Sequence, residues 1–353
     1  MDETTLRLIT LSCLPGFGVR RIASLVRDNC VDEFYRNPGR FKHLISAHAL
    51  QSLESGWARR EAEDRVHKAM RAAQTILPLG SPSYPQSLGE IYDPPPVLFC
   101  RGSIATGIRR VAVVGSRGAT SAGRTFARDL ARGLVACGIE VVSGLARGID
   151  GASHEGALAG GGTTLAVLGS GVDVIYPAEH KHLAAQIERR GAVLSELPPG
   201  TTPSPGQFPL RNRIIVGLSE AVIVVEASMK SGALITARVA LEEGRDVLAV
   251  PGRPSDPLGR GPNLLIRDGA TLVQGLEDVL EHLELGKPTL TPARGAVDMI
   301  LAKLAHSAVK SVDDLVLDTG LAAPALMARL SELELEGKIE RLPGTLFRGA
   351  SPA

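Results

Sequence analysis

The chain of 353 residues has few aromatic side chains, which make up only 3% of it, and almost no excess of charge, with a formal net charge of +1. The scarcity of aromatics argues against modules that stack a base on every strand, such as RNA-recognition sheets or serial OB-folds. The balanced charge excludes a polycation, so a nucleic-acid site would have to gather its positive charge locally. Any base stacking would then depend on one or two residues.

Paired cysteines and long apolar runs are also absent. The four cysteines (Cys13, Cys30, Cys100 and Cys137) form no Cys-x-x-Cys pair and no cluster with histidine, which disfavours a zinc site and a disulfide framework. No stretch reaches the roughly 18 apolar residues needed to span a bilayer. The acidic start of the sequence shows no signal-peptide pattern. We therefore expect a cytoplasmic protein with no metal and no cofactor.

The composition is that of a globular protein, with 44% hydrophobic and 22% charged residues, and the length predicts two or three domains. Residues 1–105 have apolar residues at helical spacing and are expected to form a small helical domain of the helix-hairpin-helix or SAM-like type. Residues 286–295 have the composition of a linker. Residues 296–353 are expected to form a winged-helix domain, with helices at 296–305, 311–318 and 323–336 and a hairpin turning at Pro343-Gly344.

Residues 106–285 alternate short apolar runs with helical patterns, from VAVVG at 111–115 to DVLAVPG at 246–252. Apolar strands separated by helices predict an α/β fold, a Rossmann-like, doubly wound and mostly parallel sheet covered on both faces. Ligands bind beyond the carboxyl ends of the strands in such sheets. Function is therefore to be sought in the loops that follow the strands.

The first of these loops, VVGSRGATSAGRT at 113–125, almost matches two phosphate motifs. It departs from the dinucleotide fingerprint because Arg117 stands where a second glycine is needed, and the next strand ends in Ser143-Gly144 rather than in an acid. Residues 118–125 have P-loop spacing with arginine in place of the lysine, and Glu226 could imitate a Walker B acid. Arginine does not simply replace lysine in that cradle, but an ATPase stays open as an alternative.

The same loop also has the features of a phosphate holder without catalysis. Gly115, Ser116 and Gly118 offer backbone N–H groups, and the following helix begins near Ser121 with the dipole end that favours anions. Arg117 adds a bidentate phosphate donor. The loop is therefore predicted to hold a phosphate without needing to cut it.

Two further strand-end loops carry a cation each. The first, SGLARGID at 143–150, has Arg147 in the loop and Asp150 where it could cap the next helix. The second, EASMKSGALITA at 226–237, has Lys230 between strand and helix, beside Ser231. Cations that follow neighbouring parallel strands are expected at one edge of the sheet.

The segment QFPLRNRIIVGLS at 207–219 opens an apolar helix with Arg211, Asn212 and Arg213. Helical spacing prevents all three from facing the sheet, so at least one arginine should project to the ligand edge. Phe208, in what reads as a loop rich in proline and glycine, either stacks on a base or staples its loop to the sheet. The predicted basic edge therefore consists of Arg117, Arg147, Arg211 or Arg213, and Lys230.

Near the N-terminus, LPGFGVRRIASLV at 14–26 joins two predicted helices through Gly16-x-Gly18. This segment resembles the hairpin of helix-hairpin-helix domains, whose turn offers amides to a DNA backbone, and Arg20 and Arg21 follow it. A purely structural helical turn is the alternative.

Taken together, the run from Val111 to Val273 resembles the DNA processing protein A family, also called DprA or Smf. The matching pieces stand in the family's order: VVGSR, SGLARGID, YP at 176–177, LSELPPG, FPLRNRIIVGLS, VVEASMKSGALITA, AVPG and GPNLLIRDGA. The resemblance implies a domain without catalytic activity that binds single-stranded DNA in a positive pocket and dimerises. It also implies that the protein loads the RecA recombinase onto incoming strands during natural transformation and displaces the single-strand-binding protein.

The resemblance assigns the predicted DNA-binding residues one by one. The family's phosphate-binding triplet falls on Gly115, Ser116 and Arg117, and its Lys-Ser-Gly falls on Lys230, Ser231 and Gly232. Its phenylalanine and Arg-Asn-Arg fall on Phe208, Arg211, Asn212 and Arg213, and Gly144 and Arg147 complete the predicted set. Some members carry a lysine just before that phenylalanine, where this chain has Pro205-Gly206-Gln207, so phosphate affinity is expected to depend more on the arginines.

Other classes stay open. A nucleotide-binding enzyme could be the P-loop-like ATPase or a nucleotide phosphoribohydrolase, although the PGGxGT loop of the latter is missing from SMKSGALITA. A plain interaction scaffold would neither bind DNA nor turn over nucleotide. In the predicted winged-helix domain, the third helix has Arg329 as its only cation beside several glutamates, so protein contact or regulation is expected there rather than DNA reading.

Overall fold

The computed structural model describes residues 2–285 and, further along, 300–301, 303–304, 309–319, 323–335, 337–342 and 346–349. The chain divides into two compact units, residues 1–287 and residues 288–353. Each unit is described by itself. No helix in these described ranges is long and apolar enough to cross a membrane.

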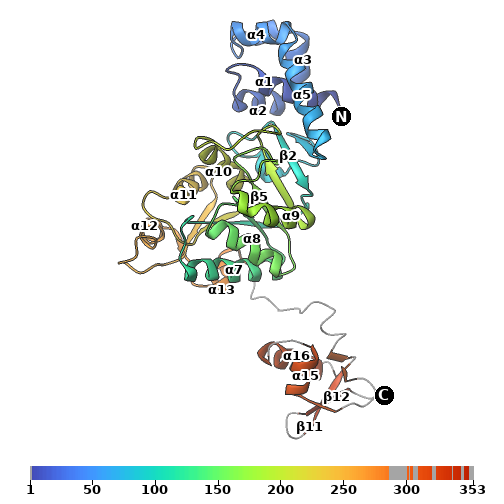
Figure 1. The fold of residues 1–353 in the computed structure, drawn as a ribbon, viewed down its shortest axis with the longest axis vertical. Coiled ribbons are helices and arrows are strands. Elements are labelled where there is room, and N and C mark those ends of the chain that lie inside the picture. Colours follow the sequence, from blue (N-terminus) through green and yellow to red (C-terminus); the bar gives the residue numbers. More distant parts are fainter. Residues whose placement is uncertain are drawn as a thin grey trace. The chain divides into compact units, whose positions relative to one another are not determined.

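The first unit begins with a group of short helices (Figure 1): α1 (Glu3–Cys13), α2 (Val19–Arg27), α3 (Val31–Arg36), η1 (Pro38–Phe41), α4 (Ala47–Glu54) and α5 (Trp57–Arg71). Asp2 begins α1 by accepting the Thr5 N–H at 2.7 Å, and Ser46 begins α4 in the same way. The buried side chains of these helices join one apolar cluster with residues of the neighbouring sheet, among them Phe99 and Val193.

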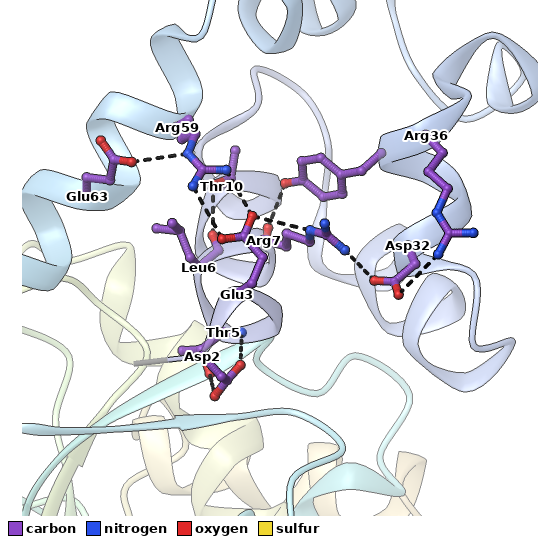
Figure 2. Close-up of polar contacts among 11 residues, drawn as sticks. Asp2, Glu3, Thr5, Leu6, Arg7, Thr10, Asp32, Arg36, Arg59 and Glu63 are labelled. Carbon is purple, nitrogen blue, oxygen red and sulfur yellow. Dashed lines mark hydrogen bonds and ion pairs between the residues drawn. The ribbon is translucent and has the colours of Figure 1, made fainter.

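Ion pairs tie three of these helices together (Figure 2). Glu3 of α1 pairs with Arg59 of α5 at 2.9 Å, and Arg59 also pairs with Glu63 at 3.1 Å. Arg7 of α1 pairs with Asp32 of α3 at 2.5 Å. Several cations of the helical region are thus neutralised by their own neighbours.

The Gly16-x-Gly18 turn joins α1 to α2, and Gly16 has a positive φ of 69°. Arg21 donates to the carbonyl of Gly16 at 2.9 Å, and the Arg20 guanidinium lies 4.2 Å from the ring centroid of Tyr92. The prediction that this turn contacts DNA stays a prediction.

A sheet of nine strands forms the body of the unit, in the order β1-β2-β6-β5-β4-β3-β7-β8-β9. The first two pairings, β1 with β2 and β2 with β6, are antiparallel, and all others are parallel. The strands are β1 (Thr75–Pro78), β2 (Val97–Gly102), β3 (Arg110–Val114), β4 (Glu140–Ser143), β5 (Thr164–Val167), β6 (Ala192–Ser195), β7 (Ala221–Val224), β8 (Asp246–Ala249) and β9 (Thr271–Leu272). The prediction of a doubly wound, mostly parallel sheet is confirmed.

The sheet starts earlier in the sequence than expected. β1 and β2 lie within residues 1–105, which the periodicity had described as helical throughout. Both strands are short: β2 pairs with the distant β6, and β1 adds to the edge of the sheet by pairing with β2, contacts that local periodicity does not report. The domain boundaries themselves stay predictions.

Helices cover both faces of the sheet (Figure 1): α6 (Gln86–Gly89), α7 (Ser121–Ala136), α8 (Ile149–Ala159), η2 (Ala178–His180), α9 (Lys181–Arg190), α10 (Gln207–Gly217), α11 (Gly232–Glu242), α12 (Arg260–Arg267) and α13 (Leu276–His282). Val111 and Val113 of β3 pack in one cluster with α7, α8 and α13. Ala112 and Val114 of the same strand pack in another cluster with α10 and α11. This alternation is what a strand buried on both faces requires.

The second unit contains β10 (Lys310–Ser311), α15 (Val312–Thr319), α16 (Ala323–Leu335), β11 (Ile339–Leu342) and β12 (Leu346–Gly349), with strand order β10-β12-β11. Its core includes Leu315, Leu330 and Phe347. Two of the three predicted helices are present, and the hairpin follows them. The predicted linker, the Pro343-Gly344 turn and most of the predicted helix at 296–305 lie outside the described residues.

One buried ion pair gives a test of the sheet. Arg110 and Glu140 begin β3 and β4, are only 8% and 1% exposed, and pair at 2.6 Å. Arg110→Ala should lower the free energy of unfolding by about 3–5 kcal/mol, because it leaves an uncompensated buried carboxylate. Urea unfolding followed by circular dichroism measures this.

The adjacent Arg109 is the matched control, because it pairs with Glu220 at 2.6 Å while both side chains are 40% exposed. Arg109→Ala should cost about 1 kcal/mol or less. Equal losses for the two variants would contradict a special role for the buried pair.

Candidate functional site

A cavity of about 600 Å³ opens at the carboxyl ends of β3 and β7. The order of the strands reverses between these two, and such a reversal is where open α/β sheets bind ligands. The cavity is bordered by the loops after both strands and by the first turns of α10 and α11. Of the predicted site residues, it brings together Gly115, Ser116, Arg117, Phe208, Arg211, Asn212, Lys230, Ser231 and Gly232.

Arg117, Phe208 and Tyr176 form one wall of the cavity. The Arg117 guanidinium lies 4.9 Å from the ring centroid of Phe208, and the Tyr176 ring lies 5.8 Å from it with a tilt of 42°. The assignment of Phe208 to a loop was wrong, since it is the second residue of α10. Helix α10 therefore positions this ring, while Arg117 remains exposed beside it.

Arg211 forms the floor of the cavity and is only 5% exposed. Its Nη1 donates to the carbonyl of Val167. Burial lowers the pKa of Arg211 to about 10, and the nearby Asp150 carboxylate counteracts part of this effect. Gly144 is required here because a Cβ at that position would overlap the guanidinium. Gly144 therefore acts by admitting Arg211 and does not itself line the cavity.

Asp150 is not the helix cap that the sequence suggested. Helix α8 begins one residue earlier, after Gly148. The Asp150 carboxylate instead accepts the backbone N–H groups of Gly144 at 3.2 Å and Ala146 at 3.4 Å, which braces the loop after β4. Burial raises the pKa of Asp150, and the charge of Arg211 opposes that rise.

Two predicted cations do not line the cavity. Arg147 forms a bidentate pair with Glu179, at 2.6 and 2.8 Å, on the exposed surface. Arg213 is buried and pairs with Glu196 at 2.5 Å and Asp93 at 3.5 Å. Positions 211 and 213 are about 200° apart around a helix, so only one of them can face the cavity.

Two backbone amides after β3, those of Ser116 and Gly118, are already engaged within the protein. The Ser116 N–H donates to the carbonyl of Glu226 at 2.6 Å, and the Gly118 N–H donates to Ser116 Oγ at 3.2 Å. The Glu226 carboxylate accepts from Thr120 N–H at 2.8 Å and from Thr120 Oγ1 at 2.6 Å at the start of α7. The Glu226 carboxylate thus takes the place of an anion at the start of α7, and the prediction that this loop holds a phosphate stays a prediction.

The same contacts argue against the P-loop alternative. A P-loop needs the amides before its helix free to hold phosphates. Here Glu226 occupies the start of α7, and the Arg124 side chain donates to the carbonyl of Ala119 at 2.5 Å. The cradle that a nucleotide triphosphate would need is thus filled by the protein's own groups.

Further polar side chains line the cavity. Lys230 is exposed on the loop after β7 and forms no ion pair with any described residue. Ser231 caps α11 by accepting the Ala233 N–H at 3.3 Å. Asn212 is 8% exposed, and its side-chain amide forms no hydrogen bond to the described part of the chain.

The lining suits a ligand that carries both phosphates and flat rings. Arg117 and Lys230, which form no ion pair with a described residue, offer positive charge. Asn212 offers an amide, and Phe208 and Tyr176 offer aromatic surface. Sequence reasoning missed Tyr176, although Tyr176-Pro177 was among the matching pieces, because no spacing rule tied it to the other loops. No group of three potential metal ligands occurs among the described residues.

Known proteins similar in sequence to this chain belong to one family, and the matches extend over most of its length. Residues 75–284 match the family model of the DNA recombination-mediator protein A, and residues 287–345 match that of the DprA winged helix domain. Protein Smf of Escherichia coli is 37% identical over 98% of this chain and 95% of its own length. DNA processing protein DprA of Bacillus subtilis is 45% identical over 59% of this chain and 70% of its own length.

Two solved structures of DNA processing protein A have the same fold as this chain. DNA processing protein A of Streptococcus pneumoniae superposes with a TM-score of 0.67 and 36% identity, covering 80% of this chain and 98% of its own. The same protein of Helicobacter pylori, described for its single-stranded DNA binding mode, superposes with a TM-score of 0.53 and 29% identity, covering 60% and 95%. The predicted resemblance and the predicted fold, with its winged-helix end, are confirmed.

The role of the Glu226 carboxylate in holding the loop before α7 can be tested at Gly123. A Cβ at Gly123 would overlap that carboxylate. Gly123→Ala should lower the free energy of unfolding by about 1–2 kcal/mol, since the clash exceeds the gain of about 1 kcal/mol in helix propensity. It should also speed amide exchange in residues 115–120. Denaturant unfolding and hydrogen exchange measure the two effects.

Gly118→Ala is the matched control in the same loop. A Cβ at Gly118 would meet no atom within 4 Å, so its unfolding midpoint should stay near that of the wild type. Faster exchange in Gly118→Ala but not in Gly123→Ala would show that Glu226 does not hold this loop.

Proposed function

Because the chain belongs to the DNA recombination-mediator protein A family, we propose that it binds single-stranded DNA in the cavity at the ends of β3 and β7. One observation supports this most. Arg117 and Lys230, which form no ion pair with a described residue, line the same cavity as the aromatic rings of Phe208 and Tyr176. The relative from Helicobacter pylori, described for its single-stranded DNA binding mode, supports the same ligand.

The cavity suggests how the strand is held. Arg117 and Lys230 bind phosphates, and the buried charge of Arg211 adds positive potential from the floor. Phe208 limits the space for a base, and Asn212 can hydrogen-bond to one. Because no row of side chains is arranged along base edges, sequence preference should be slight.

The proposal includes a role as mediator without catalysis. The protein would protect incoming single strands, displace the single-strand-binding protein and load RecA during natural transformation. To displace the single-strand-binding protein, this protein has to compete with it for the phosphates of the strand. Arg117 and Lys230 supply the phosphate contacts for that competition. We assign the winged-helix unit to protein contact or regulation.

The strand-binding step is tested with fluorescence anisotropy of a labelled oligothymidine at several salt concentrations. Three cations predict that log K falls with log salt at a slope of about −2. Arg117→Ala should weaken binding about 10- to 100-fold at low salt, because it removes a charge-assisted contact to phosphate, and should reduce the slope by about 0.7. On strands coated with single-strand-binding protein, the wild type but not Arg117→Ala should hasten RecA filament formation.

Arg147→Ala is the control, because Glu179 already pairs with Arg147 at the surface. Its affinity should stay within about threefold of the wild type, as exposed pairs contribute little. Absence of wild-type binding at low salt would refute the proposed function and would lead next to assays of nucleotide hydrolysis.

We also propose that two chains pair through the α/β body, as a mediator that holds two strand segments would require. A groove of about 390 Å³ beside α11 and α12 is lined by apolar side chains that include Leu234, Leu241, Leu264 and Leu265, and by charged ones that include Arg238 and Asp268. Leu241 is 65% exposed and Ile235, on the same helix, is 42% exposed and also lines the proposed DNA cavity. Pairing there would bring two cavities together and raise avidity.

Leu241→Arg should convert the dimer to a monomer at micromolar concentration, because it places a charge in an apolar contact. Size-exclusion chromatography with light scattering measures this. Leu317→Arg, at an 84% exposed leucine of α15, should leave the dimer intact. A wild-type monomer, or a dimer unchanged by Leu241→Arg, would contradict this interface.

A further inference from the structure

Exposed aromatic side chains are rare in this protein, and one of them borders the cavity. Among the described residues, the large aromatics more than 40% exposed are Trp57, Tyr92 and Tyr176. Of these, Tyr176 alone lines the cavity. It stands on the loop between β5 and η2 and is 45% exposed. Its ring therefore keeps open surface at the place where the strand is proposed to enter.

The neighbouring Phe208 has less surface to offer. The Arg117 guanidinium lies over its ring at 4.9 Å, and Gly169 is so near its edge that a Cβ there would lie 3.0 Å from Phe208 Cδ1. Phe208 is half-buried as a result. Its ring contacts Tyr176 as well as Arg117, with a centroid distance of 5.8 Å to the Tyr176 ring, and so supports both side chains.

Tyr176 is held by that ring contact rather than by its hydroxyl. The hydroxyl forms no hydrogen bond to any residue that the structure describes, whereas those of Tyr35 and Tyr84 each donate to a backbone carbonyl. A structural tyrosine normally satisfies its hydroxyl when it packs. The exposed ring and unused hydroxyl of Tyr176 are the features of a side chain that meets a ligand.

We propose that Tyr176 stacks on one base of the bound strand while Arg117, which also contacts the Phe208 ring, binds a phosphate of the same segment. This inference rests on the proposed function and names the residue that selects single strands. A paired base inside a duplex offers only its edges, whereas an unpaired base exposes a face to an aromatic ring. Tyr176 thus adds affinity for single strands and none for duplexes.

The test compares Tyr176→Ala with Tyr176→Phe in the full chain. Loss of one stacked base should weaken binding to oligothymidine roughly 5- to 150-fold, because aromatic stacking contributes that much per base. Tyr176→Phe keeps the ring and should stay within about twofold of the wild type. Duplex binding should not change, so the preference for single strands falls by the same factor.

Two readouts separate stacking from a loss of structure. On an abasic strand with the same number of phosphates, wild type and Tyr176→Ala should bind equally, because no base is left to stack. The salt slope of Tyr176→Ala should equal that of the wild type, whereas Arg117→Ala reduces it. Tyr92→Ala, which removes an exposed tyrosine that lies outside the cavity and also carries a stacked arginine, should change nothing.

The outcomes distinguish this inference from the proposed function. Wild-type protein that fails to bind single strands overturns both. Strong binding that Arg117→Ala weakens, together with a Tyr176→Ala variant that matches Tyr92→Ala, overturns the stacking role alone. An equal loss by Tyr176→Ala on abasic and normal strands also overturns it, since the ring would then only support the cavity wall.

Discussion

The carboxylate of Glu226 lies at the start of α7, where it accepts hydrogen bonds from both donors of Thr120, and the shape of the cavity depends on it. The backbone carbonyl of the same residue accepts the Ser116 N–H. Glu226 therefore holds the loop after β3 at two points and directs Arg117 toward the cavity. An anion at a helix start is stabilised by the free N–H groups there. This anion belongs to the protein itself, so the start of α7 is already occupied by one of the chain's own carboxylates.

The second organising feature is how the protein distributes its own acids among its arginines. Glu179 neutralises Arg147 at the surface, and Glu196 with Asp93 neutralises Arg213 in the interior. Arg117 and Lys230 have no such partner among the described residues, and both line the cavity. A chain with a net charge of only +1 can thus present a local positive site. Family membership and local charge then point to the same ligand, a polyanion with flat bases.

Burial gives the two arginines of α10 different roles. Arg211 reaches under the loop after β4, where Gly144 leaves room for it and Asp150 lies nearby. Its charge acts through the low-dielectric interior rather than by direct exposure. Arg213, two residues on, turns to the opposite side of the helix and joins α10 to the segment before β2 through Asp93. One short sequence therefore supplies both the floor of the site and the anchor that keeps it in place.

The sequence by itself determined the alternation of strands and helices, the glycine loops at strand ends and the candidates for the site, because apolar periodicity and turn chemistry are local. The tertiary structure alone decided which candidates face the cavity. Glu179 is 32 residues from Arg147, Glu196 is 17 residues from Arg213, and Glu226 is 106 residues from Thr120. The tertiary structure likewise placed β1 and β2 in the sheet and Tyr176 beside Phe208. Such contacts join residues far apart along the chain, and no local pattern encodes which acid a given arginine will meet.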